Sequence, residues 1–175
     1  MRWVALLRAV NLGSRNKVSM AQLRTLLEEA GYGSVRTYIA SGNVLFDGPS
    51  KRAELGAALE TLVADAFGVT TTAILRRPPE LAKIVRGHPF GADTSETHVA
   101  FLAARPAKAA VARLEEATAT PEQAVLAGAD LYLRLPRGVH RAGFSAARVE
   151  SLLGVQATLR NWRTVAKLAD LAAEA

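Results

Sequence analysis

Cysteine is absent from this 175-residue sequence, which excludes disulfide bonds, thiolate metal sites and a cysteine nucleophile. No uncharged run exceeds ten residues, so no segment is predicted to cross a bilayer as a helix. Only five uncharged residues separate Arg2 from Arg8, too few for the apolar core of a signal peptide. We therefore expect a soluble, cytoplasmic protein with no membrane partner.

The motifs that mark common active sites are also missing. The sequence has no GxxxxGK[ST] phosphate loop, no GxGxxG, no HExxH and no GxSxG. Its three histidines, His88, His98 and His140, are scattered rather than spaced as metal ligands. We therefore predict no metal site and no cofactor.

Positive charge is concentrated at the two ends of the sequence. The net charge is +6 and the pI about 10.2. Residues 1–27 carry five bases and no acid, and residues 131–169 carry seven bases against Glu150 alone. Such ends would attract polyanions if they met in space. A bias towards arginine, which outnumbers lysine 17 to 5, could equally reflect genome composition.

The first 77 residues have the pattern of a ferredoxin-like, or split βαβ, unit. A capping box of Ser19 and Gln22 predicts a helix at 19–30, and Ser41-Gly42 indicates a hairpin turn. The apolar and β-branched runs predict strands at 2–10, 35–39, 43–47 and 69–75, with a second helix from Pro49-Ser50 to Gly68.

Residues 78–175 repeat part of this pattern. We predict a short helix from Pro78 to Gly87, then a βαββα half with a terminal helix at 159–172. No linker separates the halves, so 1–77 and 78–175 are expected to pack as one unit. The fold class is therefore α+β, with a ferredoxin-like N-terminal half and a related C-terminal half.

One candidate binding site lies where the first strand leads into a capped helix. The loop from Arg8 to Lys17 precedes a helix N-terminus, where free N–H groups favour an anion. In a ferredoxin-like unit the first strand–helix loop and the hairpin lie at the same end of the sheet. The candidate ligand-binding residues here are Arg8, Asn11, Lys17, Ser41, Gly42 and Asn43. Tight-turn and loop-capping roles would explain Gly42, Asn43 and Asn11 equally well.

A second candidate site is the start of the last helix. With Thr158 as its cap, Arg160 and Arg163 would stand in the first turn beside Asn161. Cations there oppose the helix dipole by roughly 0.3–1 kcal/mol each, unless a carboxylate or a bound anion compensates. The arginines therefore either pair with acids of the other half or line an anion site, and Trp162 is predicted to be a core residue.

These segments resemble a bacterial family known as domain of unknown function 1697, over nearly the whole chain. The motifs are ALLRAVN at 5–11, KVSM at 17–20, TYIASGNVLF at 37–46 and RNWRTV at 160–165. Many members carry glycine where this chain has Ala9. The resemblance implies an α+β fold with ferredoxin-like parts, and it implies no established activity.

Three functions remain open at this point. The first is binding of a phosphorylated or otherwise anionic ligand, such as a nucleotide or nucleic acid, at the basic helix starts. The second is a metal-independent enzyme acting on a small anionic substrate, with Ser41 or Tyr38 taking part. The third is an architectural protein without a ligand, whose halves or copies associate.

Overall fold

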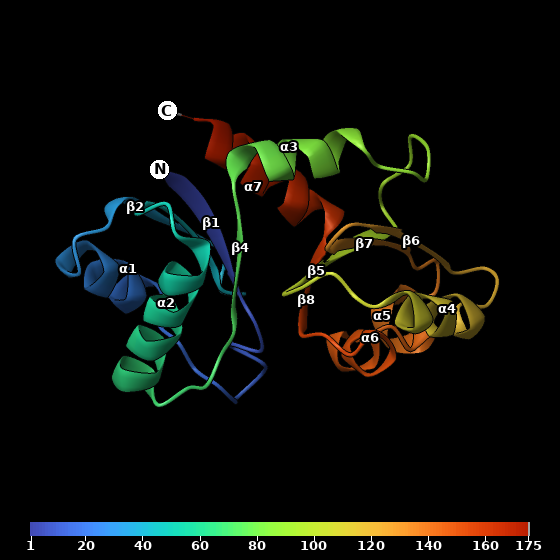
Figure 1. Cartoon of the computed structure of the whole chain (residues 1–175), viewed down its shortest axis with the longest axis horizontal. Coiled ribbons are helices and arrows are strands. Elements are labelled where there is room, and N and C mark those ends of the chain that lie inside the picture. The colour runs from blue at the N-terminus through green and yellow to red at the C-terminus, as the bar shows by residue number, and fades with distance from the viewer. Residues whose placement is uncertain (175) are drawn as a thin grey trace. The chain divides into compact units, whose positions relative to one another are not determined.

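Two four-stranded antiparallel sheets with the same strand order organise the computed structural model, which describes residues 1–174 (Figure 1). The chain divides into two compact units. Unit 1 comprises Met1–Leu81 and the chain from Leu168 onward, and unit 2 comprises Ala82–Lys167. Unit 1 is therefore discontinuous in sequence.

Unit 1 is the predicted ferredoxin-like unit, with sheet order β2-β3-β1-β4. Its elements are β1 (Arg2–Leu7), α1 (Met20–Glu29), β2 (Gly33–Tyr38), β3 (Asn43–Asp47), α2 (Arg52–Phe67) and β4 (Ala73–Arg76). The capping box is confirmed, because Ser19 Oγ accepts a hydrogen bond from the Gln22 N–H. Gly68 ends α2 in a left-handed conformation, as predicted. The fourth strand begins only at Ala73, later than the β-branched run from Val69 indicates.

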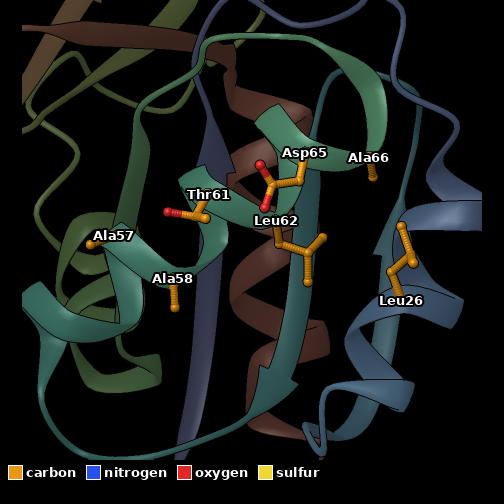
Figure 2. Close-up of a pocket in the computed structure, with 7 residues that line it drawn as sticks. All are labelled: Leu26, Ala57, Ala58, Thr61, Leu62, Asp65 and Ala66. Carbon is orange, nitrogen blue, oxygen red and sulfur yellow. The ribbon is translucent and has the colours of Figure 1, made fainter.

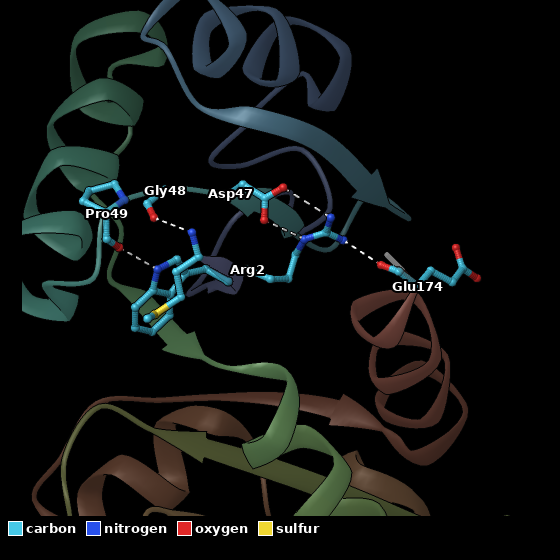
Figure 3. Close-up of polar contacts among 7 residues, drawn as sticks. Arg2, Asp47, Gly48, Pro49 and Glu174 are labelled. Atoms are coloured by element: carbon cyan, nitrogen blue, oxygen red, sulfur yellow. Dashed lines mark hydrogen bonds and ion pairs between the residues drawn. The ribbon is translucent and has the colours of Figure 1, made fainter.

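The core of unit 1 lies between its sheet and the helices α1 and α2. Trp3 and Phe46 are its largest buried side chains, and the Trp3 Nε1–H donates to Pro49 O at 2.8 Å. Arg2 binds Asp47 through two hydrogen bonds of 3.0 and 3.3 Å and also donates to Glu174 O (Figure 3). The hydrogen bond from Arg2 holds the pKa of the Asp47 carboxyl below its usual value. The hydrogen bond from Arg2 to Glu174 O connects β1 to the residue that follows α7 (Trp162–Ala173) within unit 1.

Unit 2 has the sheet order β6-β7-β5-β8. Its elements are β5 (Thr97–Leu102), α4 (Lys108–Ala117), β6 (Gln123–Ala127), β7 (Asp130–Arg134), α5 (Gly138–Ala142), α6 (Ala146–Leu153) and β8 (Ala157–Asn161), preceded by α3 (Pro78–Arg86), which begins in unit 1. Its core lies between the sheet and α4 and α6. The short helix α5 was not predicted.

The prediction of a helix from 159 was wrong, because residues 157–161 form strand β8 and the helix begins at Trp162. Unit 2 is therefore a full βαββαβ unit, not the incomplete repeat expected. The repeat extends to register: Arg76 of β4 pairs with Val4, and Arg160 of β8 pairs with Val99. The segments Ala73-Ile74-Leu75-Arg76 and Ala157-Thr158-Leu159-Arg160 occupy equivalent positions in the two sheets.

Candidate functional site

The loop between β1 and α1 is closed by its own polar groups. Asn11 Nδ2–H₂ donates to Val18 O at 2.9 Å and to Ala40 O at 2.7 Å, while Asn11 Oδ1 accepts from the Val18 N–H. The Asn11 N–H donates to Asn16 O, and Asn16 Nδ2–H₂ donates to Ala9 O. Asn11 therefore ties the loop both to the start of α1 and to the β2–β3 hairpin.

The hairpin residues Ser41, Gly42 and Asn43 do lie beside this loop, as the topology predicts. The Leu7 N–H donates to Gly42 O at 2.8 Å. Asn43 is fully buried, and its Nδ2–H₂ donates to Tyr38 O and to Ser41 Oγ, both at 2.9 Å. The polar groups of Asn11 and Asn43 thus bind the chain itself, which gives these motif residues a structural role.

The two basic candidates of unit 1 differ in their setting. Arg8 is held at the end of β1 through its backbone, since its N–H donates to Thr72 O and its carbonyl accepts from Thr71 Oγ1. Lys17 is exposed. Neither residue lines either of the two hollows described below.

Ala9 occupies a backbone conformation that suits glycine. Its φ is 55°, in the left-handed region where a Cβ costs roughly 1–2 kcal/mol. An Ala9→Gly variant is expected to gain about 1 kcal/mol of unfolding free energy, less than the strain because glycine has more freedom in the unfolded chain. Urea denaturation would measure the gain. A loss of stability would show that the Ala9 side chain makes contacts worth more than the strain.

Arg160 does not stand in a helix, contrary to the sequence-based expectation. It lies in β8, is 6% exposed, and donates to Thr158 Oγ1 at 2.7 Å and to Leu159 O at 2.8 Å. Burial lowers the pKa of its guanidinium to about 10, so Arg160 stays charged at neutral pH. Arg160 is therefore the strand residue equivalent to Arg76 of β4, rather than a residue of a helix start.

The last helix begins at Trp162, and its cap is Asn161 rather than Thr158. The Thr164 N–H donates to Asn161 Oδ1 at 2.9 Å, the geometry of a helix N-cap. Arg163 then stands in the first turn, as predicted, and no carboxylate pairs with it among residues 1–174. The positive end of the helix dipole and a guanidinium without a counter-charge therefore lie together.

A polar hollow of about 620 Å³ opens at this helix start, within unit 2. It is lined by Thr94, Ser95, His98, Asn161, Trp162 and Arg163. His98 and Asn161 face each other because β5 pairs with β8 in a register that matches these two residues. The hollow thus gathers hydroxyls, an imidazole, an amide and a guanidinium.

The aromatic residues of the hollow have defined surroundings. The Trp162 ring lies 4.4 Å from that of His88, whose Nε2 is 2.9 Å from the buried Thr97 Oγ1. His98 Nδ1 is buried without a hydrogen-bond partner within the described chain. Burial also lowers the pKa of His98, so its imidazole is neutral at pH 7. The structure places Trp162 at the rim of the hollow as a half-buried residue rather than in the core.

Sequence reasoning missed Thr94, Ser95 and His98 as members of a site. Their segment lies more than sixty positions before Arg163, and the link between them is the β5–β8 pairing. The signal that could have revealed it was the match of Ala157-Thr158-Leu159-Arg160 to Ala73-Ile74-Leu75-Arg76. That match would have identified β8 and hence its neighbour β5.

A second hollow, of about 610 Å³, lies between α1 and α2 in unit 1 (Figure 2). Leu26 of α1 lines one side, and small or apolar residues of α2 line the other. Asp65 is the one charged group among its lining residues. The hollow is therefore apolar and lacks the convergent polar groups of the first.

Two classes of site are absent from the residues that the structure describes. No group of three or more His, Asp or Glu side chains is placed to hold a metal ion. No helix has both the length and the apolarity needed to span a membrane.

Comparisons with protein families and with solved structures support the α+β fold. The family described as "Protein of unknown function (DUF1697)" matches residues 1–132. No curated protein matches the chain. The solved structure of the conserved bacterial protein SP0830 from Streptococcus pneumoniae is similar, with a TM-score of 0.76 and 22% identity, over 98% of each chain. At that identity the likeness shows the α+β fold alone.

Proposed function

This chain belongs to the DUF1697 family, and we propose that it binds a small phosphorylated or otherwise anionic ligand at the start of α7. The observation that carries the proposal is the convergence of three groups in one hollow. These are the start of α7, which Asn161 caps, the guanidinium of Arg163 and the imidazole of His98. Asn161 and Arg163 come from the set predicted from the sequence.

A bound anion would resolve an unfavourable electrostatic arrangement. Arg163 in the first turn opposes the helix dipole, at roughly 0.3–1 kcal/mol when exposed. An anion in the hollow would interact favourably with both the guanidinium and the positive end of the helix dipole. The imidazole of His98, which is neutral at pH 7, would line the same hollow as an uncharged polar group.

The size of the hollow favours a small ligand over a nucleic acid. Pockets for small ligands measure roughly 300–1,000 Å³, and about 620 Å³ lies within that range. Four of the ten arginines at the basic ends are engaged by carboxylates. The pairs are Arg2–Asp47, Arg24–Glu28, Arg134–Glu96 and Arg137–Glu122. These four guanidinium groups are already bound to carboxylates, so they are less available to a phosphate backbone.

An Arg163→Gln variant is expected to bind anions at least about tenfold more weakly. A hydrogen bond to a charged group contributes about 1.5–3 kcal/mol, and about 1.4 kcal/mol corresponds to tenfold in affinity. Titration calorimetry with AMP, ADP and inorganic phosphate at low salt would measure the affinities. Arg141→Gln removes the same charge from an exposed position of unit 2 outside the hollow, and should leave them unchanged.

Two outcomes would contradict the proposal. Absence of binding by the unmodified protein to all three probes up to millimolar concentration would exclude a phosphate ligand. Equal losses in the Arg163 and Arg141 variants would attribute binding to net charge rather than to the hollow. Fluorescence anisotropy with labelled RNA and DNA at two salt concentrations would then test a nucleic-acid surface, since steep weakening with salt indicates many phosphate contacts.

A further inference from the structure

The four edge strands of the two sheets differ in how they are protected against further pairing. All four residues of β4 are buried, and most of β8 is buried, with the Ala157 N–H donating to Glu150 Oε1. β2 carries Arg36 and a register shift between Gly33 and Arg36. Burial, charges and bulges are the usual devices that stop an edge strand from pairing with another chain.

Strand β6 has none of these devices. Its residues, Gln123–Ala127, include no charge and no proline, and its register with β7 is unbroken from end to end. Val125 is 40% exposed, and within residues 1–174 no other strand carries so exposed a large apolar side chain. β6 is therefore the edge of this protein that is open to strand addition.

We propose that β6 pairs with the β6 strand of a second copy of this chain. Antiparallel pairing about a two-fold axis would extend the four-stranded sheet of unit 2 into one continuous sheet across two copies. The register follows from the hairpin: Ala127 and Asp130 close a two-residue turn, so Ala124 and Leu126 turn their backbone groups to the free edge. Ala124 of one copy then exchanges hydrogen bonds with Leu126 of the other.

The side chains of β6 suit a self-pairing strand. Ala124 and Leu126 pack towards the core of unit 2, so Val125 stands on the opposite face of the sheet. In the proposed register Val125 meets Val125 at the axis, an apolar β-branched pair. No charge of β6 meets its own copy, and the nearby Glu122 is already paired with Arg137 at 2.8 Å.

The strength of this dimer is limited by the length of the strand. Five residues bury less than the roughly 1,200 Å² of a stable interface, so the dimer should depend on concentration. Each copy also carries a net charge of +6, which opposes association at low salt. Raising the salt concentration should therefore strengthen the dimer, the reverse of its effect on phosphate binding.

The test is sedimentation velocity of the full chain over a wide concentration range. We expect a monomer–dimer equilibrium that Val125→Lys weakens about tenfold or more, since the change replaces an apolar pair by two like charges. Because Val125 is exposed, the variant should keep the thermal stability of the monomer. Ala57→Lys is the matched control, because it places the same charge in the apolar hollow between α1 and α2.

Hydrogen exchange locates the contact independently. The amides of Ala124 and Leu126 should exchange more slowly as protein concentration rises. A protein that stays monomeric up to about millimolar concentration would overturn the proposal. A dimer broken by Ala57→Lys and unaffected by Val125→Lys would also overturn it, by placing the contact on α2. Slowed exchange only on adding an extended peptide would assign the edge to another kind of partner.

Discussion

A Gly42→Ala variant should lose about 3–4 kcal/mol of unfolding free energy, the combined effect of overpacking and backbone strain. A Cβ at this position would lie 2.5 Å from Val10 Cγ2 and 2.9 Å from Leu7 Cβ, distances that real side chains do not adopt. Gly42 also has a φ of 83°, which disfavours any side chain. The end of β1 and the hairpin would have to move apart, and the hydrogen bond from the Leu7 N–H to Gly42 O would weaken.

Gly13→Ala is the matched control for this change. Gly13 has a φ of 56°, yet nothing lies within 4 Å of a Cβ built there. This variant should therefore lose only the conformational part, about 1 kcal/mol. Urea denaturation of both variants would separate the two effects. Similar losses of unfolding free energy in both variants would contradict this prediction. They would show that the hairpin shifts to accommodate a Cβ at position 42 at little cost.

An Asn11→Ala variant should lose about 3 kcal/mol of unfolding free energy, because the Asn11 side chain makes three hydrogen bonds that each contribute about 1 kcal/mol. Its amide donates to Val18 O and Ala40 O and accepts from the Val18 N–H. Alanine also tolerates the φ of 52° at this position less well than asparagine. The loop should then detach from both the helix start and the hairpin.

Asn16→Ala is the matched control, because it distinguishes the loss of the Asn11 hydrogen bonds from the cost of placing alanine at a positive φ. Asn16 has a similar φ of 53°, but its side chain makes a single hydrogen bond, to Ala9 O. The Asn16→Ala variant should therefore lose about 1–2 kcal/mol of unfolding free energy. Thermal denaturation of the pair would measure the difference. If Asn11→Ala left stability intact and changed ligand affinity instead, Asn11 would be a binding residue rather than a structural one.

The elements of unit 1 were predictable because their signals are local. The capping box of Ser19 and Gln22, and the left-handed glycine after α2, act within a single helix turn. The split βαβ order follows from those elements, since few topologies connect them. The predicted proximity of the first loop and the hairpin is confirmed by the hydrogen bonds from Leu7 to Gly42 and from Asn11 to Ala40, but no local pattern specifies which backbone groups are bound.

The error at β8 has a definite cause. Leu159, Trp162 and Val165 continue the helical spacing of α7 backwards into the strand, so the apolar pattern contains no sign of the boundary. Tertiary pairing with β5 overrides that local pattern. The polar hollow depends on the same pairing, and for that reason it could not be found before the strand was known.

The first segment of unit 1 is synthesised before unit 2, and its last segment is synthesised after unit 2. Its strands β1 to β4 are synthesised before unit 2, but its buried residues Leu168 and Leu171 follow only after unit 2 has been made. The hydrogen bonds from Arg2 and Arg36 to Glu174 span 172 and 138 positions of the chain. Unit 2 is continuous, so it can finish all of its strand pairs while unit 1 still lacks its last part. Unit 1 can therefore form its sheet and core early in synthesis, as N-terminal parts normally do, but it makes its contacts with the C-terminal segment only after unit 2 has been synthesised.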